Sequence, residues 1–396
     1  MHPSGGFSRW LILLSISCLS VACGIAGEAG LRDRVRTLDR QRVLAAAEQA
    51  LLIAPVTVTA TRSPRSAGGI HDYFSEGDYW WQDPGNPEGP YIRRDGMTNP
   101  DNFVGHRHSL MQFGVQLATL TAAYRLTDDR RFADFAVRHL KAWCVDEATR
   151  MNPHVLYAQA IRGRVTGRGI GIIDAIHLIE VARSVDFLEH SSALVPADAV
   201  AIKRWFADFL LWITTHPYGV EEREAKNNHG TWWVAQVAAF ARLTGDTATE
   251  AFCRKRFKEV LLPGQMAADG SFPLELERTK PYGYSLFNLE GMAVICKLLS
   301  TTQDNLWTFT LPDGRTMSRG IAYMLPFIID KKSWPHPPDV MHFEELPIRH
   351  ATLLFATEAL GDERCFSAWQ SLPGDPTSEE AIRSMPVRQP VLWIEQ

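Results

Sequence analysis

The chain has few cysteines, and none of them has the spacing of a metal-binding motif. Six occur in 396 residues, and the four that follow residue 27 stand far apart: Cys144, Cys253, Cys296 and Cys365. Without a CxxC pair, a structural zinc site is not expected. Export would permit disulfides, but buried free thiols fit the spacing at least as well. His106 and His108 form an HxH pair that lacks a clear third ligand, so we expect no metal and no cofactor.

A basic excess is also absent. The formal net charge is −4, and it becomes −5 if the first 27 residues, which include Arg9, are removed. A mildly acidic protein is a poor candidate for nonspecific binding to nucleic acid. A local basic cleft can still bind a polyanion, and the twelve tryptophans suit either a core or stacking on sugars. The oligomeric state stays open.

Long hydrophobic runs are confined to the N-terminus. Arg9 precedes the apolar stretch Trp10–Leu14, and small residues continue to Gly27. This run is too short to span a bilayer, so it predicts a signal peptide over residues 1–27 and a periplasmic or secreted protein. Cys23 lies in an imperfect lipobox, because Ser20 stands where a leucine is wanted, and lipid anchoring is the alternative. No other segment predicts a membrane-spanning helix.

Strand signals are scarce, and helical periodicity dominates. Val56–Thr59 and Trp307–Thr310 are short strand candidates, and strands and helices do not alternate. This pattern argues against a Rossmann fold or a TIM barrel. Helix pairs joined by short turns predict an all-α fold, an incomplete (α/α) toroid of helical hairpins with a central groove. We expect one domain over residues 28–396, with a long substrate-binding loop at 54–104.

A helix–turn–helix pattern occurs three times. Its turns begin at Leu126, Leu243 and Leu360, which are spaced by 117 residues each. The periodicity of apolar residues predicts helices over residues 31–53, 109–124, 131–143, 171–189, 197–213, 231–242, 249–262, 286–301, 316–330, 351–360 and 364–372.

Two polar segments precede predicted helices and are suited to chemistry. The first contains Lys226, Asn228 and His229, just before the helix at 231–242. A helix N-terminus offers free N–H groups that favour carboxylates. The alternative is that an asparagine caps the helix and His229 is a core histidine. Two asparagines and a histidine exceed what one cap needs, so the functional interpretation stays open.

The second segment contains Arg278, Tyr282 and Tyr284, just before the helix at 286–301. A tyrosine has a reference pKa of about 10 and needs a nearby cation to act as a base. Arg278 or Lys280 could be that cation. The alternative is a capped helix start in which Lys280 pairs with a glutamate and both tyrosines belong to the core.

Two loop segments add residues suited to sugars and carboxylates. Aromatic, arginine and asparagine side chains interleave at 72–102, and a segment with several glycines and arginines lies at 152–169. Arginine forks bind carboxylates, and indole faces stack on sugar rings. The alternatives are a loop that packs its tryptophans under the toroid and an exposed basic turn at 162–164. The predicted substrate-binding residues are Trp80, Trp81, Tyr91, Arg93, Arg94, Asn102, Tyr157, Gln159, Arg168, Lys226 and Tyr282.

Together these motifs resemble the alginate-lyase superfamily of polysaccharide lyases. Asn228, His229, Arg278 and Tyr284 carry the resemblance, and the stretches at 78–84 and 90–96 look like the N-terminal signature of the family. The resemblance covers most of the mature chain, about residues 70–370. One departure is Gln82, which stands where a proline is expected. The other is the Arg278–Tyr284 spacing, one residue shorter than in the best-known alginate lyases, which leaves Tyr282 as a rival phenol.

The resemblance implies a toroid that cleaves a uronic-acid polymer, alginate or a related polyuronate, by β-elimination without a metal. Asn228, His229 and Arg278 would match the carboxylate-neutralising and base positions, and Tyr284 would match the catalytic tyrosine. The product would carry a 4,5-unsaturated uronate end. The base stays open between His229 and Tyr284, and so do the preferred uronate and endo or exo action. The expected partner is an anionic polysaccharide or oligosaccharide.

Two other functions stay open. Inverting glycoside hydrolases also use helical toroids and need two carboxylates, for which Asp72, Glu221, Glu222 and Glu344 are available. A noncatalytic glycan-binding protein would use the same aromatic and arginine clusters, and a fold alone does not choose among these functions.

Overall fold

Helices form most of the described chain. The computed structural model describes residues 1–2 and 30–394. Beyond its first two residues, the predicted signal peptide, with Cys23, lies outside them. The α-helices are α1 (Leu31–Ala50), α2 (Gly105–Thr127), α3 (Arg130–Cys144), α4 (Leu178–Leu188), α5 (Pro196–Thr215), α6 (Pro217–Arg223), α7 (Asn228–Thr244), α8 (Thr247–Arg256), α9 (Leu262–Gln265), α10 (Pro273–Leu276), α11 (Pro281–Leu299), α12 (Met317–Ile329), α13 (Ala351–Leu360), α14 (Glu363–Ser371) and α15 (Glu379–Ser384). Among the described residues, none of the helices has the length and apolar character needed to cross a bilayer.

Three of the helical hairpins share one turn chemistry. In the pairs α2–α3, α7–α8 and α13–α14, the first helix ends at a residue in the left-handed conformation, which glycine and aspartate tolerate. An aspartate then caps the second helix by accepting a bond from a backbone N–H group. The left-handed residues are Asp128, Gly245 and Gly361, and the caps are Asp129, Asp246 and Asp362. The recurring pattern in the sequence is therefore confirmed as a recurring hairpin.

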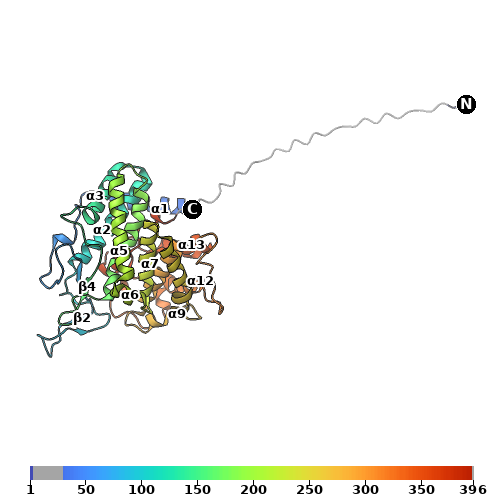
Figure 1. Cartoon of the computed structure of the whole chain (residues 1–396). Coiled ribbons are helices and arrows are strands. Elements are labelled where there is room, and N and C mark those ends of the chain that lie inside the picture. The colour runs from blue at the N-terminus through green and yellow to red at the C-terminus, as the bar shows by residue number, and fades with distance from the viewer. Residues whose placement is uncertain (3–29, 395–396) are drawn as a thin grey trace.

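The hairpins form two layers of helices. In the inner layer α2, α4, α7, α11 and α13 contact one another in that order, and α1, α3, α5, α8, α12 and α14 pack outside them. Figure 1 shows α5 and α7 side by side through the middle of the molecule. The ends of the ring meet at α1, where Arg34 pairs with Glu363 of α14 at 2.8 Å. The predicted all-α fold, an incomplete (α/α) toroid, is confirmed.

Aromatic side chains fill much of the space between the layers. Phe113 of α2 stacks on Trp143 of α3 with ring centroids 4.8 Å apart. Five tryptophans are among the largest fully buried side chains: Trp143, Trp232, Trp233, Trp369 and Trp393. Much of the tryptophan surplus therefore belongs to the core. Cys144, Cys253, Cys296 and Cys365 are buried free thiols, as the simpler interpretation of their spacing expects.

The short strands lie elsewhere than predicted. Residues 56–59 overlap the 3-10 turn η1 (Val58–Ala60), and residues 307–310 form no strand, so both strand predictions are wrong. Within the described residues, β1 (Phe74–Glu76) pairs in parallel with β4 (Tyr157–Ala160), and β2 (Trp80–Trp81) pairs antiparallel with β3 (Ile92–Arg93). These pairs tie the loop at 54–104 to itself and to the segment before α4.

Shorter helical turns complete the described chain. The predicted helix at 171–189 is divided, because the 3-10 turn η2 precedes α4. The remaining turns are η2 (Gly169–Ala175), the π-turn η3 (Phe257–Leu261), η4 (Lys331–Ser333), η5 (Phe343–Glu345) and η6 (Pro390–Leu392). Packing of η6 against α1 and α2 brings the C-terminal segment back to the start of the ring.

Candidate active site

One cavity of about 440 Å³ collects the polar motifs found in the sequence. Its wall comes from the stretches 78–93, 159–176, 225–229, 278–287, 339–346 and 380–384. Helices α7 and α11 both begin at this wall, where carboxylates of Glu275 and Asp339 accept bonds from their first backbone N–H groups. The predicted site residues that line it are Trp80, Arg93, Gln159, Arg168, Asn228, His229, Arg278 and Tyr284.

The phenol of Tyr284 is held by two neighbours. Its Oη lies 2.6 Å from Oη of Tyr79 and 3.3 Å from Nη2 of Arg278. Two hydrogen bonds to Asp95, of 3.2 and 3.0 Å, fix the Arg278 guanidinium. Burial and Tyr79 raise the pKa of Tyr284 well above its usual 10, and Arg278 offsets only part of that rise. The phenol therefore keeps its proton at neutral pH, with the Arg278 guanidinium beside its oxygen.

The imidazole of His229 has a fixed orientation. His229 stands in the first turn of α7, and its Nδ1 lies 2.6 Å from Oε1 of Glu222 in α6. Glu222 is buried, with 2% of its side chain exposed. A carboxylate accepts hydrogen bonds from an imidazole N–H group, so this contact occupies Nδ1 and leaves Nε2 as the ring nitrogen available for acid–base chemistry. The half-buried ring is thus oriented by Glu222 at the edge of the cavity.

Asn228 is bound to a buried carboxylate. Its backbone N–H and its Nδ2 donate to Glu275 at 2.7 and 2.8 Å. The cap of α7 is therefore Glu275 rather than Asn227, whose side chain makes no capping bond. Burial raises the pKa of Glu275, and these two bonds oppose the rise.

Five cations line the cavity, and four of them form ion pairs. Arg93 and Arg278 pair with Asp95, Lys280 with Glu380, and Arg383 with Asp78. Arg168 has no ion pair among residues 30–394. It donates instead to the backbone oxygen and Oε1 of Gln159, at 3.0 and 2.9 Å.

Gln159 carries backbone strain to hold Arg168. Its φ of 48° lies in the left-handed region, which costs a residue with a side chain about 1 kcal/mol or more. Its Nε2 also donates to Asp174 at 3.1 Å, and its backbone N–H donates to Ser75 at 2.8 Å. These contacts aim Gln159 at Arg168, so the strain serves to place an unpaired guanidinium at the cavity.

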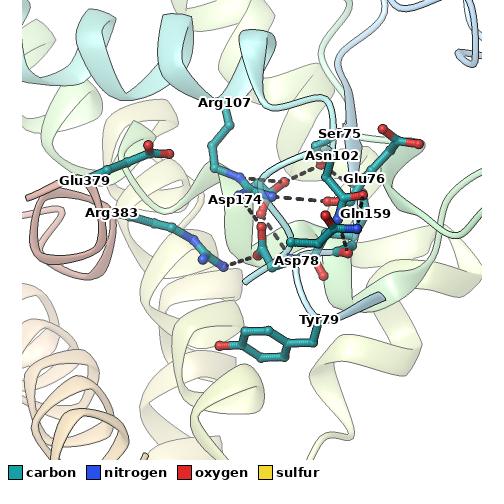
Figure 2. Close-up of polar contacts among 12 residues, drawn as sticks. Ser75, Glu76, Asp78, Tyr79, Asn102, Arg107, Gln159, Asp174, Glu379 and Arg383 are labelled. Carbon is teal, nitrogen blue, oxygen red and sulfur yellow. Dashed lines mark hydrogen bonds and ion pairs between the residues drawn. The ribbon is translucent and has the colours of Figure 1, made fainter. Parts of the chain in front are cut away.

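A buried charge network lies behind Tyr79 (Figure 2). Asp78 sits between Arg107 of α2 and Arg383 of α15, with N–O distances of 2.5 and 2.7 Å. Arg107 also lies 3.6 Å from Asp174. Burial would raise the pKa of Asp78, but the charges of Arg107 and Arg383 outweigh it and lower that pKa. Because Asp78 precedes Tyr79 in the chain, the network fixes the backbone from which Tyr79 reaches the Tyr284 phenol.

Sequence reasoning missed several residues of the wall. Tyr79 stands inside a stretch that was singled out for its tryptophans, and its hydroxyl could have been considered there. Glu380 and Arg383 come from α15, where no motif marks them. Lys280 was expected either to lower a tyrosine pKa by its charge or to pair with a glutamate, and it was not expected in the wall of the site. Lys280 lies with its Nζ 2.8 Å from Glu380 and 5.5 Å from the centre of the Tyr79 ring.

Tyr282 faces away from the cavity. It is fully buried, its hydroxyl donates to the backbone oxygen of Phe327 at 3.1 Å, and its ring packs edge-on against Trp334 and Phe343. The expectation that it binds substrate therefore conflicts with its position, because its phenol is already used in the core. Of the two candidate phenols, only Tyr284 lines the cavity.

Six further predicted substrate-binding residues also lie outside the cavity wall: Trp81, Tyr91, Arg94, Asn102, Tyr157 and Lys226. Asn102 is buried and donates to the backbone oxygen of Gly77 at 2.7 Å. The Trp81 indole donates to Met97, and Arg94 lies over the Trp81 ring at 5.0 Å. These side chains stabilise the loop itself, and Lys226 is exposed to solvent.

His106 and His108 do not act together. Nε2 of His106 lies 2.8 Å from the backbone oxygen of Thr61, and its Nδ1 accepts from the N–H of Phe74. His108 pairs with Glu379 at 2.6 Å. Residues 30–394 contain no group of three or more His, Cys, Asp or Glu side chains placed to hold a metal ion.

Comparisons with known proteins agree with this arrangement. The family model described as alginate lyase matches residues 57–334. The crystal structure of an alginate lyase from Bacteroides ovatus is 30% identical, with a TM-score of 0.78 over 90% of this chain and 97% of that one. A structure of alginate lyase A1-III with a bound tetrasaccharide has 14% identity and a TM-score of 0.57, over 93% and 99% of the two chains, and shows likeness of fold alone. No curated protein sequence matches significantly. The family match spans most of the chain, and the chain accordingly belongs to the alginate lyase family of polysaccharide lyases.

Proposed function

We propose that this enzyme cleaves alginate or a related polyuronate by β-elimination. The observation that carries the proposal is a single cavity lined by an imidazole, a phenol and a guanidinium without an ion pair: His229, Tyr284 and Arg168. These are the groups that elimination beside a sugar carboxylate needs. The tetrasaccharide in the structure of alginate lyase A1-III supports an oligosaccharide as the class of ligand.

The first requirement is to neutralise the uronate carboxylate. The C5 proton of a uronate is very weakly acidic while its carboxylate is charged, because removing it concentrates negative charge on one group. Arg168 is the cavity cation free to bind that carboxylate, and its guanidinium fork matches carboxylate geometry. The Asn228 amide lies in the same wall, and its Nδ2 also donates to Glu275. Each such donor, placed in advance, contributes a few kcal/mol to stabilising the enolate-like intermediate.

The second requirement is an acid and a base. In the proposed reaction Nε2 of His229 removes the C5 proton, and the electron pair forms the C4–C5 double bond as the C4–O4 bond breaks. The Tyr284 phenol gives its proton to the departing O4. The contact of Glu222 with Nδ1, which leaves Nε2 of His229 available, and the raised pKa of Tyr284 favour this division of roles over a Tyr284 phenolate acting as base.

The hydrolase alternative has less support. Asp78 and Glu380 face the cavity but pair with cations, and Asp339 accepts the backbone N–H groups of Tyr282 and Gly283 at 2.9 Å each. Glu222 is engaged by His229. An inverting hydrolase needs two carboxylates free to act as acid and base, and the described lining offers no such pair.

The N-terminal segment supports a periplasmic or secreted location for the proposed activity.

A panel of polyuronates tests the function directly. Mannuronate-rich, guluronate-rich and glucuronate-containing polymers are incubated with the mature enzyme, and ultraviolet absorbance of a conjugated double bond is followed together with reducing ends. We expect both signals to rise in parallel on at least one polymer, and to fall when its carboxylates are methyl-esterified, because the ester removes the charge that Arg168 binds. Reducing ends without absorbance would mean hydrolysis and would reject the proposal.

Glu222→Gln should impair the base without removing it. The amide can keep the bond to Nδ1 of His229, but it no longer stabilises the positive charge that the imidazole gains with the C5 proton. We expect kcat to fall about 10–100-fold, below the 10²–10⁴-fold contribution of a complete acid or base group. The matched control is Glu221→Gln, an exposed neighbour that leaves His229 untouched. Equal kcat values for the two variants would remove His229 from the role of base.

A further inference from the structure

A second hollow, of about 850 Å³, lies next to the cavity without sharing any lining residue with it. We call it the basic groove; its wall includes strand β1, the turn at 161–165 and Tyr218 of α6. The turn is closed by a bridge between Ile161 and Val165. The sequence marked this segment as either an exposed basic turn or a substrate loop, and the proposed chemistry at the cavity makes no use of it.

The groove carries two cations that are not neutralised. Arg65 is paired with Glu76 through hydrogen bonds of 2.7 and 2.5 Å. Arg162 and Arg164 are exposed and form no ion pair within residues 30–394. The charges of the lining therefore leave an excess of two positive charges, in a chain whose overall charge is negative.

The turn that presents these arginines is held rigidly. Nε of Arg164 donates to the backbone oxygen of Tyr91 at 2.8 Å, and the N–H of Tyr91 donates to Arg162 at 3.1 Å. Gly163, at φ 72°, approaches Pro90 so closely that an added Cβ would lie 2.9 Å from its Cα. The long loop and the turn thus hold each other in place, which lowers the entropic cost of binding a ligand.

Aromatic rings connect the groove to the cavity. The Arg164 guanidinium lies 5.1 Å from the centre of the Trp80 ring, and that of Arg168 lies 5.9 Å from the same ring. Arg162 lies 5.8 Å from the Tyr91 ring. Guanidinium groups near aromatic faces keep their N–H edges available for carboxylates. Trp80 and Arg168 line the cavity, so a row of cations leads from it into the groove.

We propose that the basic groove binds a second stretch of the same polyuronate chain, away from the bond that is cleaved. This inference rests on the proposed function for the identity of the ligand. A polyuronate carries a carboxylate on each sugar. When one uronate of the polymer binds Arg168, further uronates of the same polymer can bind Arg164 and Arg162. The groove would then favour long polymers over short oligosaccharides, which fill only the cavity.

The test measures binding of polymer and short oligosaccharide separately. The double variant Arg162→Gln/Arg164→Gln is made in a Tyr284→Phe background, which we expect to bind without turnover, and Kd is measured by calorimetry. Two exposed charge contacts predict about a fivefold higher Kd for the polymer and an unchanged Kd for short oligosaccharides. The control Arg130→Gln/Arg204→Gln removes the same charge from exposed sites on α3 and α5.

Each result decides the proposal. A loss of affinity for the polymer alone, absent from the control variant, supports polymer binding in the basic groove. The proposal is overturned if the polymer Kd is unchanged. It is also overturned if Kd rises equally for short oligosaccharides, or rises equally in the control variant. Because binding is read without turnover, absence of an unsaturated product from the parent enzyme would reject the β-elimination proposal while leaving the binding comparison intact.

Discussion

Tyr284→Phe is expected to lower kcat by about 10³-fold, within the range for loss of a positioned acid group. The substitution removes one oxygen and leaves the ring in place, so the departing O4 would have to leave without a proton. KM should change little, because the carboxylate-binding groups are untouched. The measurement is the initial rate of absorbance increase on the best polyuronate, with Kd for the same polymer determined in parallel.

Tyr282→Phe provides the matched control. It removes a hydroxyl from the same helix at a position that faces the core, where it donates to Phe327. Losing one buried hydrogen bond should lower the free energy of unfolding by about 1 kcal/mol and leave kcat within about twofold. A slow Tyr282→Phe enzyme together with a fast Tyr284→Phe enzyme would reverse the assignment of the phenol.

Arg107→Met is expected to lower the free energy of unfolding by about 3–5 kcal/mol. Arg107 is 98% buried beside Asp78 and Asp174, and removing one partner of a buried ion pair leaves an uncompensated charge. Asp78 would keep Arg383, but Asp174 would lose its nearest cation. Denaturant unfolding followed by circular dichroism measures the change.

Two further variants separate the charge effect from simple loss of side-chain volume. Arg130→Met, on an exposed position of α3, should shift stability by less than about 0.5 kcal/mol. Asp174→Asn in the Arg107→Met background should recover part of the loss, because the amide removes the stranded charge. If the double variant is less stable than Arg107→Met by the full cost of Asp174→Asn alone, the two groups act independently and the interpretation is wrong.

Local sequence patterns predicted most helices and the recurring hairpins of the fold. Apolar periodicity marked the helices, and the recurring turns after Leu126, Leu243 and Leu360 marked the hairpins. The wrong strand at 56–59 shows the limit of such rules. Its alternating valine and threonine residues favour a strand, but no strand within residues 30–394 pairs with it, and Val58–Ala60 form a 3-10 turn instead.

The choice between Tyr282 and Tyr284 could have been made from the sequence. Residues two positions apart on a helix point about 200° apart around its axis. Tyr282 shares a face with Leu286 and Leu289, four and seven positions later, whereas Tyr284 falls on another side. The apolar face goes to the core, so helical phase alone assigns Tyr282 to it.

The polar wall could not be predicted in the same way. Asp78 meets Arg383, and Arg278 meets Asp95, across stretches of chain that no local pattern relates. Glu222 differs, because it lies only seven residues before His229. The sequence offered it as a hydrolase carboxylate, and the short connection between α6 and α7 directs it toward His229 instead.

The position of α15 also bears on how activity would be lost by partial unfolding. Arg383 supplies the second cation of Asp78, and Glu380 holds Lys280 beside Tyr79. Both side chains belong to one short helix, so detachment of that helix would remove two ion pairs from the reaction chamber together. Local opening of α15 would therefore inactivate the enzyme while the rest of the helical ring stays folded.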